Sequence, residues 1–318
     1  MKKFLKIGML TCFSLAGLTC ANAWAQTKVT IGMNGWTGYA PLSLALKEGI
    51  FKKNGLDVTI KLIPQKDRHL ALASGDLQCA TTAVQTHLMW TQNGVPITQI
   101  FLMDKSAGAD GLVVRGNIKG FADLKGKTIA VDAAGTTPHF MLAWMLQSNG
   151  LSLKDVKLAN LSPQAAAQAF VAGQNEAAIT YEPYLSSIRQ NPNAGKILVT
   201  TNDYPIIIDT FGCDPKWLKA NPKVAQAITD SYFEALELIK TNPKHAYAVM
   251  GAEVKQSGED FAKSASYLKW QDKAANREFF ANEIIPFMKK AAKVNIESGV
   301  MKTEPADYKA LIDTSFIQ

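Results

Sequence analysis

Short apolar runs alternate with stretches of helical spacing along the first two thirds of the chain. Residues 29–33 are rich in β-branched side chains, and LDVTIKL at residues 56–62 alternates apolar and polar positions as a half-buried strand does. Between them, residues 41–49 carry apolar side chains on one helical face and end at a glycine. Further strands are predicted over residues 77–81, 97–103, 128–131, 156–161, 177–180, 197–200 and 206–209. This alternation predicts α/β sheets covered by helices.

The strand-and-helix pattern occurs twice and is followed by a helical tail. The second set begins near Gly111, and from Pro215 onward the spacing is almost wholly helical. Such a tail predicts that the chain returns to the first unit and packs on it. We therefore expect two lobes, each a mainly parallel sheet flanked by helices, with crossings near residues 107–112 and 208–213. Crossings this short favour a hinge between the lobes.

The first residues have the order of a secretory signal peptide. Three lysines precede an apolar run over residues 7–18, and alanines follow at positions 21, 23 and 25. Cleavage after Ala23 or after Ala25 fits, and we assign the signal peptide to residues 1–25. The apolar run is too short to remain as a span of a bilayer about 30 Å thick. The exported chain then divides into a first lobe (26–109 and 211–318) and a second lobe (110–210).

Charge and cysteine content narrow the class of protein. The formal net charge is +7, and three of the positive charges lie in the signal peptide, so the exported chain is only mildly basic. No lysine and arginine run marks a nucleic-acid surface, and we expect no nucleic-acid partner. Only Cys79 and Cys213 remain after cleavage. One disulfide is possible in an oxidising compartment, although Cys79 between apolar neighbours also fits a small buried residue.

Four ordered blocks resemble one family. They read GWTGYAPLSLA continuing into KEGIFKKNGLDV (35–58), LASGDL (72–77), DLKGKTIAV (123–131) and YEPY (181–184). They are similar to the nitrate/sulfonate/taurine family of periplasmic binding proteins of ABC transporters, and to the related thiamine-pyrimidine-binding proteins. The resemblance implies a two-lobed periplasmic binding protein fold of type II, a periplasmic location, a ligand cleft without catalysis and a transient inner-membrane permease partner. We expect a monomer.

The candidate ligand-binding residues lie where predicted strands end, because ligands of open α/β sheets bind outside the carboxyl ends of strands. They are Gly35, Trp36, Thr37, Tyr39, Thr81, Thr82, Gln85, Asp110, Thr136, Thr137, His139, Tyr181, Glu182 and Asp209. Glycines and helix starts can bring backbone N–H groups to an anion. The loop containing Thr136 and Thr137 is the best such candidate, and the resemblance implies that it holds an anionic group.

Glu182 bears on the kind of ligand. A carboxylate in a partly dry cleft is costly without a partner, so we expect it to meet a cation, an amine or several N–H donors. Basic residues near the loops are few, which argues against a bare anion such as nitrate. The interpretation is therefore an aliphatic sulfonate or taurine-like solute, or a related amine-bearing compound. The alternatives are a pyrimidine or thiamine-precursor heterocycle, a ligand-sensing ectodomain, or an enzyme of the thiamine-pyrimidine-synthase type.

The sequence lacks the motifs of common enzymes. There is no Gly-x-Ser-x-Gly elbow, no phosphate-binding loop of the Gly-x-x-x-x-Gly-Lys type and no His-x-x-x-His pair. The cysteine-rich motif of the thiamine-pyrimidine synthase is also missing. We therefore expect no enzymatic activity, no cofactor and no metal site.

Overall fold

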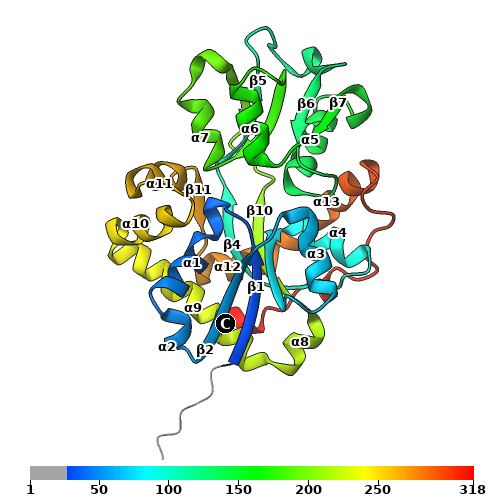
Figure 1. The fold of residues 1–318 in the computed structure, drawn as a ribbon. Coiled ribbons are helices and arrows are strands. Elements are labelled where there is room, and N and C mark those ends of the chain that lie inside the picture. Colours follow the sequence, from blue (N-terminus) through cyan, green and yellow to red (C-terminus); the bar gives the residue numbers. More distant parts are fainter. Residues whose placement is uncertain (1–26) are drawn as a thin grey trace, which may run out of the picture.

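The computed structural model describes residues 27–318, so the predicted signal peptide lies outside the described residues. Two β-sheets flanked by helices form two lobes, with the second lobe at the top of Figure 1. Within residues 27–318, every helix is too short or too polar to span a bilayer. The predicted two-lobed α/β fold class is confirmed.

The first sheet has six strands in the order β11-β4-β10-β3-β1-β2. The strands are β1 (Thr27–Met33), β2 (Leu56–Leu62), β3 (Cys79–Ala83), β4 (Thr98–Ser106), β10 (Ile208–Cys213) and β11 (Leu268–Trp270). Strand β1 runs parallel to β2 and β3, whereas β10 is antiparallel to β3 and β4 and β11 is antiparallel to β4.

The second sheet has five strands in the order β7-β6-β8-β5-β9. The strands are β5 (Asp110–Val114), β6 (Thr128–Val131), β7 (Lys157–Asn160), β8 (Ala177–Tyr181) and β9 (Lys196–Thr200). Strand β6 is parallel to β7 and β8, and β5 is antiparallel to β8 and β9. Both sheets are therefore mixed rather than mainly parallel.

The path of the chain between the lobes explains the antiparallel pairs. Strand β4 leads out of the first sheet and β10 leads back into it, so these neighbours run in opposite directions. In the second sheet, β5 brings the chain in and β9 leads it out, so these neighbours are also antiparallel. Residues 208–213, expected as a crossing, are strand β10 of the first sheet, and the return lies within residues 201–207.

Helices cover the faces of both sheets, and a helical tail completes the molecule (Figure 1). The α-helices are α1 (Ala40–Lys47), α2 (Ile50–Lys53), α3 (Gln65–Ala73), α4 (Val84–Gln92), α5 (Thr137–Ser148), α6 (Pro163–Val171), α7 (Tyr184–Arg189), α8 (Pro215–Ala220), α9 (Pro222–Thr241), α10 (Pro243–Glu253), α11 (Gly258–Ala265), α12 (Lys273–Glu278) and α13 (Ile284–Glu297). Shorter turns are η1 (Thr37–Tyr39), η2 (Phe121–Leu124), η3 (Leu153–Asp155), η4 (Pro192–Ala194), the π-turn η5 (Phe279–Glu283), η6 (Lys309–Leu311) and η7 (Ser315–Ile317).

The tail packs on both lobes rather than on the first alone. In the first lobe, buried Tyr232 of α9 stacks on Phe101 with ring centroids 4.9 Å apart, and Phe101 stacks on Phe211 at 4.8 Å. Helix α13 instead contacts α4 and α5, and its Ala291 and Val294 belong to the apolar core of the second lobe. The end of the chain therefore connects the two cores on one side of the hinge.

A disulfide joins the return strand to the centre of the first sheet. Cys79 of β3 and Cys213 of β10 are directly paired across the antiparallel ladder and form an S–S bond. Both residues are fully buried. The possibility that the sequence left open is thereby decided in favour of the disulfide, and the alternative of an unpaired small residue at position 79 is wrong.

Removing this disulfide should destabilise the first lobe. The bond closes a loop with a sequence separation of 134 residues and so restricts the unfolded chain. We expect the Cys79→Ala/Cys213→Ala variant to lose about 2–4 kcal/mol of unfolding free energy in urea denaturation. Dithiothreitol should lower the stability of the wild type similarly and leave the variant unchanged; a variant as stable as the oxidised wild type would contradict this.

Candidate functional site

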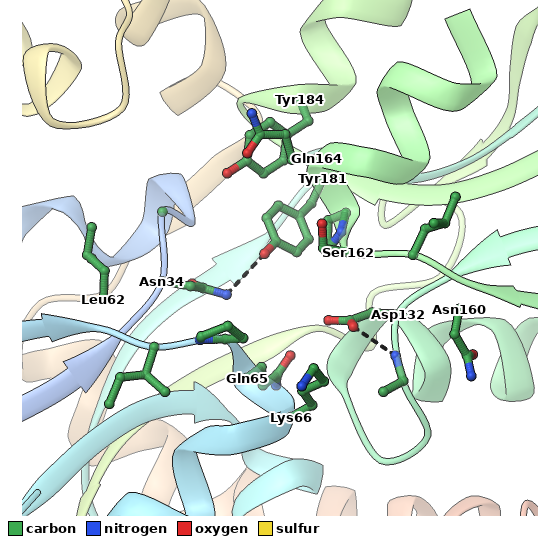
Figure 2. Close-up of a pocket in the computed structure, with 16 residues that line it drawn as sticks. Asn34, Leu62, Gln65, Lys66, Asp132, Asn160, Ser162, Gln164, Tyr181 and Tyr184 are labelled. Carbon is green, nitrogen blue, oxygen red and sulfur yellow. Dashed lines mark hydrogen bonds between the residues drawn. The ribbon is translucent and has the colours of Figure 1, made fainter. Parts of the chain in front are cut away.

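A cavity of about 480 Å³, here called the main pocket, lies between the carboxyl ends of strands from both sheets (Figure 2). The residues that follow β1 and β2 line one side, and those that follow or end β6, β7 and β8 line the other. Its lining residues are Asn34, Gly35, Leu62, Ile63, Pro64, Gln65, Lys66, Asp132, Ala133, Asn160, Leu161, Ser162, Pro163, Gln164, Tyr181 and Tyr184. This is the place where α/β folds bind ligands.

The main pocket has one cationic and one anionic wall residue, on opposite lobes. Lys66 comes from the start of α3, and Asp132 directly follows β6 (Figure 2). Burial raises the pKa of the Asp132 carboxyl, while the N–H of Ala133 and the nearby charges of Lys66 and Arg68 oppose that shift. The Lys66 ammonium lies 2.8 Å from the exposed carboxylate of Asp67. In residues 27–318, Asp132 has no ion-pair partner within 4 Å.

Tyr181 connects the two walls of the main pocket. Its hydroxyl accepts a hydrogen bond of 3.0 Å from the Asn34 side chain (Figure 2). Its ring meets that of Trp36 edge to face, with 5.3 Å between the ring centroids. Of the candidate residues, Gly35 and Tyr181 line the main pocket. Trp36 lies beside it and lines a neighbouring cavity with Gly35.

Gln65 joins the two lobes beneath the main pocket. Its amide nitrogen donates to the hydroxyls of Thr82 in the first lobe and Thr137 in the second, the latter at 2.7 Å. Its carbonyl oxygen accepts from the backbone N–H of Thr137 at 3.1 Å. The first turn of α5, expected to hold an anionic group, therefore receives a side chain of the opposite lobe in this structure. Its neighbour Thr136 lines a separate cavity of about 350 Å³.

Two candidate aromatic residues donate hydrogen bonds to buried carboxyl groups. The indole N–H of Trp36 donates to Asp104 at 3.2 Å, and the hydroxyl of Tyr39 donates to Asp209 at 2.8 Å. Asp104 and Asp209 are cross-strand partners on β4 and β10, and both are buried. Burial and mutual repulsion raise the pKa of Asp104, and burial raises that of Asp209 to about 7. Tyr39 and Asp209 thus form part of the interior beneath the pocket rather than its wall.

Arg68 is a fully buried cation in the same layer. Its Nε and Nη2 donate to the carbonyl of Ile63 at 3.3 and 3.0 Å, and Nη1 donates to the carbonyl of Thr81. No carboxylate of residues 27–318 lies within 4 Å of it. Burial lowers the pKa of the guanidinium, and Tyr39, Tyr181 and Asp209 oppose this shift. Its positive charge therefore acts through the low-dielectric interior on the buried carboxyl of Asp209 and on the two tyrosines.

Glu182 does not line the main pocket, which corrects the expectation that its carboxylate faces the cleft. The side chain is fully buried; Oε1 pairs with Nε of Arg189 at 3.2 Å and Oε2 accepts from the backbone N–H of Ser186 at 3.1 Å. Arg189 also donates to the carbonyl of Gly108 in the crossing at 2.8 Å. A cation from the protein thus satisfies Glu182, and the residue ties the second lobe to the crossing segment.

Other candidate residues carry buried polar atoms that have no hydrogen-bond partner within the described chain. They are Oγ1 of Thr37, Oγ1 of Thr81, both amide atoms of Gln85, Oδ2 of Asp110 and Nδ1 of His139. Such atoms are rare in folded proteins, and these belong to residues that the sequence singled out. None of these residues lines the main pocket itself.

The sequence missed most polar residues of the wall. Gln65, Lys66, Asp132, Ser162 and Tyr184 all face the main pocket but were not among the candidates. Their common signal is position, because each lies within two residues of a strand end or of the start of the next helix. Applying the strand-end rule to every predicted strand, rather than to the glycine-rich and hydroxyl-rich loops alone, would have found them.

Comparison with known proteins places the chain in a family. The sequence model of the NMT1-like family matches residues 22–252. The chain belongs to the NMT1-like family. The taurine-binding periplasmic protein of Escherichia coli (strain K12) is 28% identical over 177 residues, 54% of this chain and 54% of that protein. The chain thus aligns with about half the length of this curated relative. The resemblance inferred from the four sequence blocks is confirmed.

Solved structures share the fold across nearly the whole chain. The alkanesulfonate-binding protein SsuA from Xanthomonas axonopodis pv. citri bound to MOPS superposes with a TM-score of 0.76 at 17% identity, covering 92% of this chain and 99% of that one. The desulfurization enzyme DSZB superposes with a TM-score of 0.66 at 12% identity, covering 92% and 97%. The fold therefore occurs in binding proteins and in an enzyme. Within residues 27–318, no three histidine, cysteine or acidic side chains are placed to hold a metal ion.

Asp110 should make stability fall as pH rises. Burial raises the pKa of its carboxyl from an ordinary 3.8 to about 8, with Asp209 and Glu182 acting in the same direction. Between about pH 4 and pH 8 the unfolded chain has lost this proton while the folded protein keeps it, so the stabilisation present below pH 4 disappears toward pH 8.

We expect Asp110→Asn to flatten this pH dependence. The gain in melting temperature over the wild type should be small at pH 5 and grow steadily to pH 8, as measured by thermal unfolding. Asp57→Asn, which changes an exposed carboxylate on β2, is the matched control and should follow the wild type. Parallel curves for the wild type and Asp110→Asn would show that Asp110 is already ionised in the folded protein.

Proposed function

We propose that this chain is the periplasmic solute-binding component of an ABC importer that takes a taurine-like aminosulfonate. The observation that carries the proposal is the main pocket, which lies between two lobes and presents Lys66 and Asp132 from opposite walls. A zwitterion supplies the opposite charge to each: a sulfonate for Lys66 and an ammonium for Asp132. We assign the lobes to residues 27–109 with 208–318 and to residues 110–207, because residues 208–213 form strand β10 of the first sheet. The solute is released to an inner-membrane permease.

Both charges are needed because they belong to different lobes. A solute bound to one lobe meets only one of them, whereas closure brings Lys66 and Asp132 to the same molecule. The ligand therefore favours the closed state by its differential affinity for it. Charge-assisted hydrogen bonds in a desolvated pocket are stronger than neutral ones, which gives the zwitterion an advantage over a singly charged solute. The names of the relatives, taurine-binding and alkanesulfonate-binding, support the same chemistry.

A second candidate is an amine-bearing aromatic heterocycle. Tyr181 and Tyr184 line the main pocket with ring centroids 5.8 Å apart, and their faces offer a surface for a planar ring. Asp132 would then bind an exocyclic amine. This candidate leaves Lys66 without a partner from the ligand, which is the reason we place it second.

A ligand screen tests the proposal. Purified protein lacking the signal peptide is heated with taurine, ethanesulfonate, ethylamine, nitrate or an aminopyrimidine, and the melting temperature is recorded. We expect the largest rise with taurine, because a ligand at about one hundred times its dissociation constant adds about 2.7 kcal/mol of stability. A larger rise with nitrate would exclude the zwitterion, and one with the aminopyrimidine alone would favour the second candidate.

Asp132→Asn should separate the amine from the sulfonate. We expect this variant to weaken taurine about 10- to 100-fold, the value of one charge-assisted hydrogen bond, and to leave ethanesulfonate within about twofold. Isothermal titration calorimetry gives both affinities. Glu182→Gln is the comparison variant: because Glu182 pairs with Arg189, it should change both ligands equally. A loss confined to taurine in Glu182→Gln, and absent in Asp132→Asn, would reverse the assignment.

A further inference from the structure

A second cavity of about 200 Å³, here called the side chamber, lies next to the main pocket within the first lobe. Its walls come from β1, α1, β2 and α10, and most of its side chains are apolar: Met33, Trp36, Leu46, Ile60, Met250 and Val254. Its two charged residues, Lys47 of α1 and Glu253 of α10, pair with each other at 3.0 Å. The side chamber therefore offers a ligand apolar surface and no uncompensated charge.

The side chamber and the main pocket adjoin each other. Asn34, Gly35 and Leu62 line both cavities. Gly35 stands at the junction: a Cβ built there lies 3.5 Å from the Tyr184 hydroxyl in the main pocket and 3.8 Å from Cγ1 of Val254 in the side chamber. A side chain larger than that of alanine at position 35 would therefore occupy space between the two cavities.

Leu62 gives an independent sign that apolar groups belong at this junction. It is 68% exposed, the most exposed large apolar side chain among residues 27–318. It lies on the partition shared by the two cavities, where an apolar ligand group would cover it. Covering exposed apolar surface is favourable in proportion to its area.

We propose that the side chamber binds the apolar tail of a solute whose charged head occupies the main pocket. The inference rests on the proposed function for the head group and adds the class of tail, an alkyl or aryl substituent. Taurine itself fills only the main pocket. The preferred solute is therefore an amphiphilic aminosulfonate rather than taurine.

N-alkyltaurines test the proposal because they keep both charges and vary only the tail. Calorimetry measures the dissociation constants of taurine and its N-methyl, N-butyl and N-hexyl derivatives with the full exported chain. Burying one methylene is worth about 0.8 kcal/mol, so each should lower the dissociation constant about fourfold until the side chamber is full.

Ser43→Leu provides the matched variant. Ser43 of α1 is a small buried residue that lines the side chamber, and leucine at this position occupies part of the volume. We expect this variant to bind taurine as tightly as the wild type does. The increase in affinity with longer alkyl tails should disappear. Ser148→Leu, the same exchange at an exposed position at the end of α5, should retain the gain. Should Ser43→Leu fail to fold, Val254→Phe reduces the volume from the opposite wall.

The outcomes separate this inference from the proposed function. Taurine binding without a gain along the series overturns the side-chamber proposal alone. A gain that persists in both volume-filling variants also overturns it, because the tail then lies elsewhere. Failure of taurine and of every derivative to bind overturns the proposed solute class, and the tail assignment with it.

Discussion

Buried charge at the edge where the two lobes meet is the constraint on which the rest of the site depends. Arg68, Asp104, Asp110 and Asp209 are all desolvated there, and none of them has an ion-pair partner within 4 Å among residues 27–318. Isolated buried charges cost several kcal/mol unless they are neutralised or hydrogen-bonded. Protonation of the carboxyls and hydrogen bonds from Trp36 and Tyr39 meet that cost.

The division of the cleft into two layers follows from this constraint. The inner layer buries most of the candidate polar residues, and its Gln65 caps the first N–H of α5 from the opposite lobe. The outer layer keeps Lys66 and Asp132 at the pocket wall without a buried protein partner. Specific recognition is therefore left to side chains just outside the strand ends, while the inner layer fixes how the lobes meet.

Sequence patterns predicted the fold more completely than the site. The apolar, β-branched run at residues 128–131 predicted one strand, and alternation predicted the limits of another at residues 56–62. It did not reveal β5, because DGLVV is buried throughout and has no alternation, so the strand was taken for part of a crossing. In the site, Gly35 and Tyr181 were found, but the segments after β2 and β7, which supply much of the pocket wall, were not among the candidates. The first turn of α5 meets Gln65 of the other lobe, and no local sequence pattern records such a contact.

The walls of the two cavities come from different parts of the protein. In the proposed site this difference sets the order in which the ligand tail binds and the lobes close. Every wall of the side chamber belongs to the first lobe, whereas the main pocket is complete only when both lobes contribute. An apolar tail can therefore bind the open protein, where contact with the second lobe is absent. The charged head gains its second partner, Asp132, only on closure. Tail contacts thus raise affinity in both states, while the charged pair alone shifts the equilibrium toward the closed state. Solutes with the wrong head group would be captured without closing the lobes, which confines delivery to those that satisfy both charges.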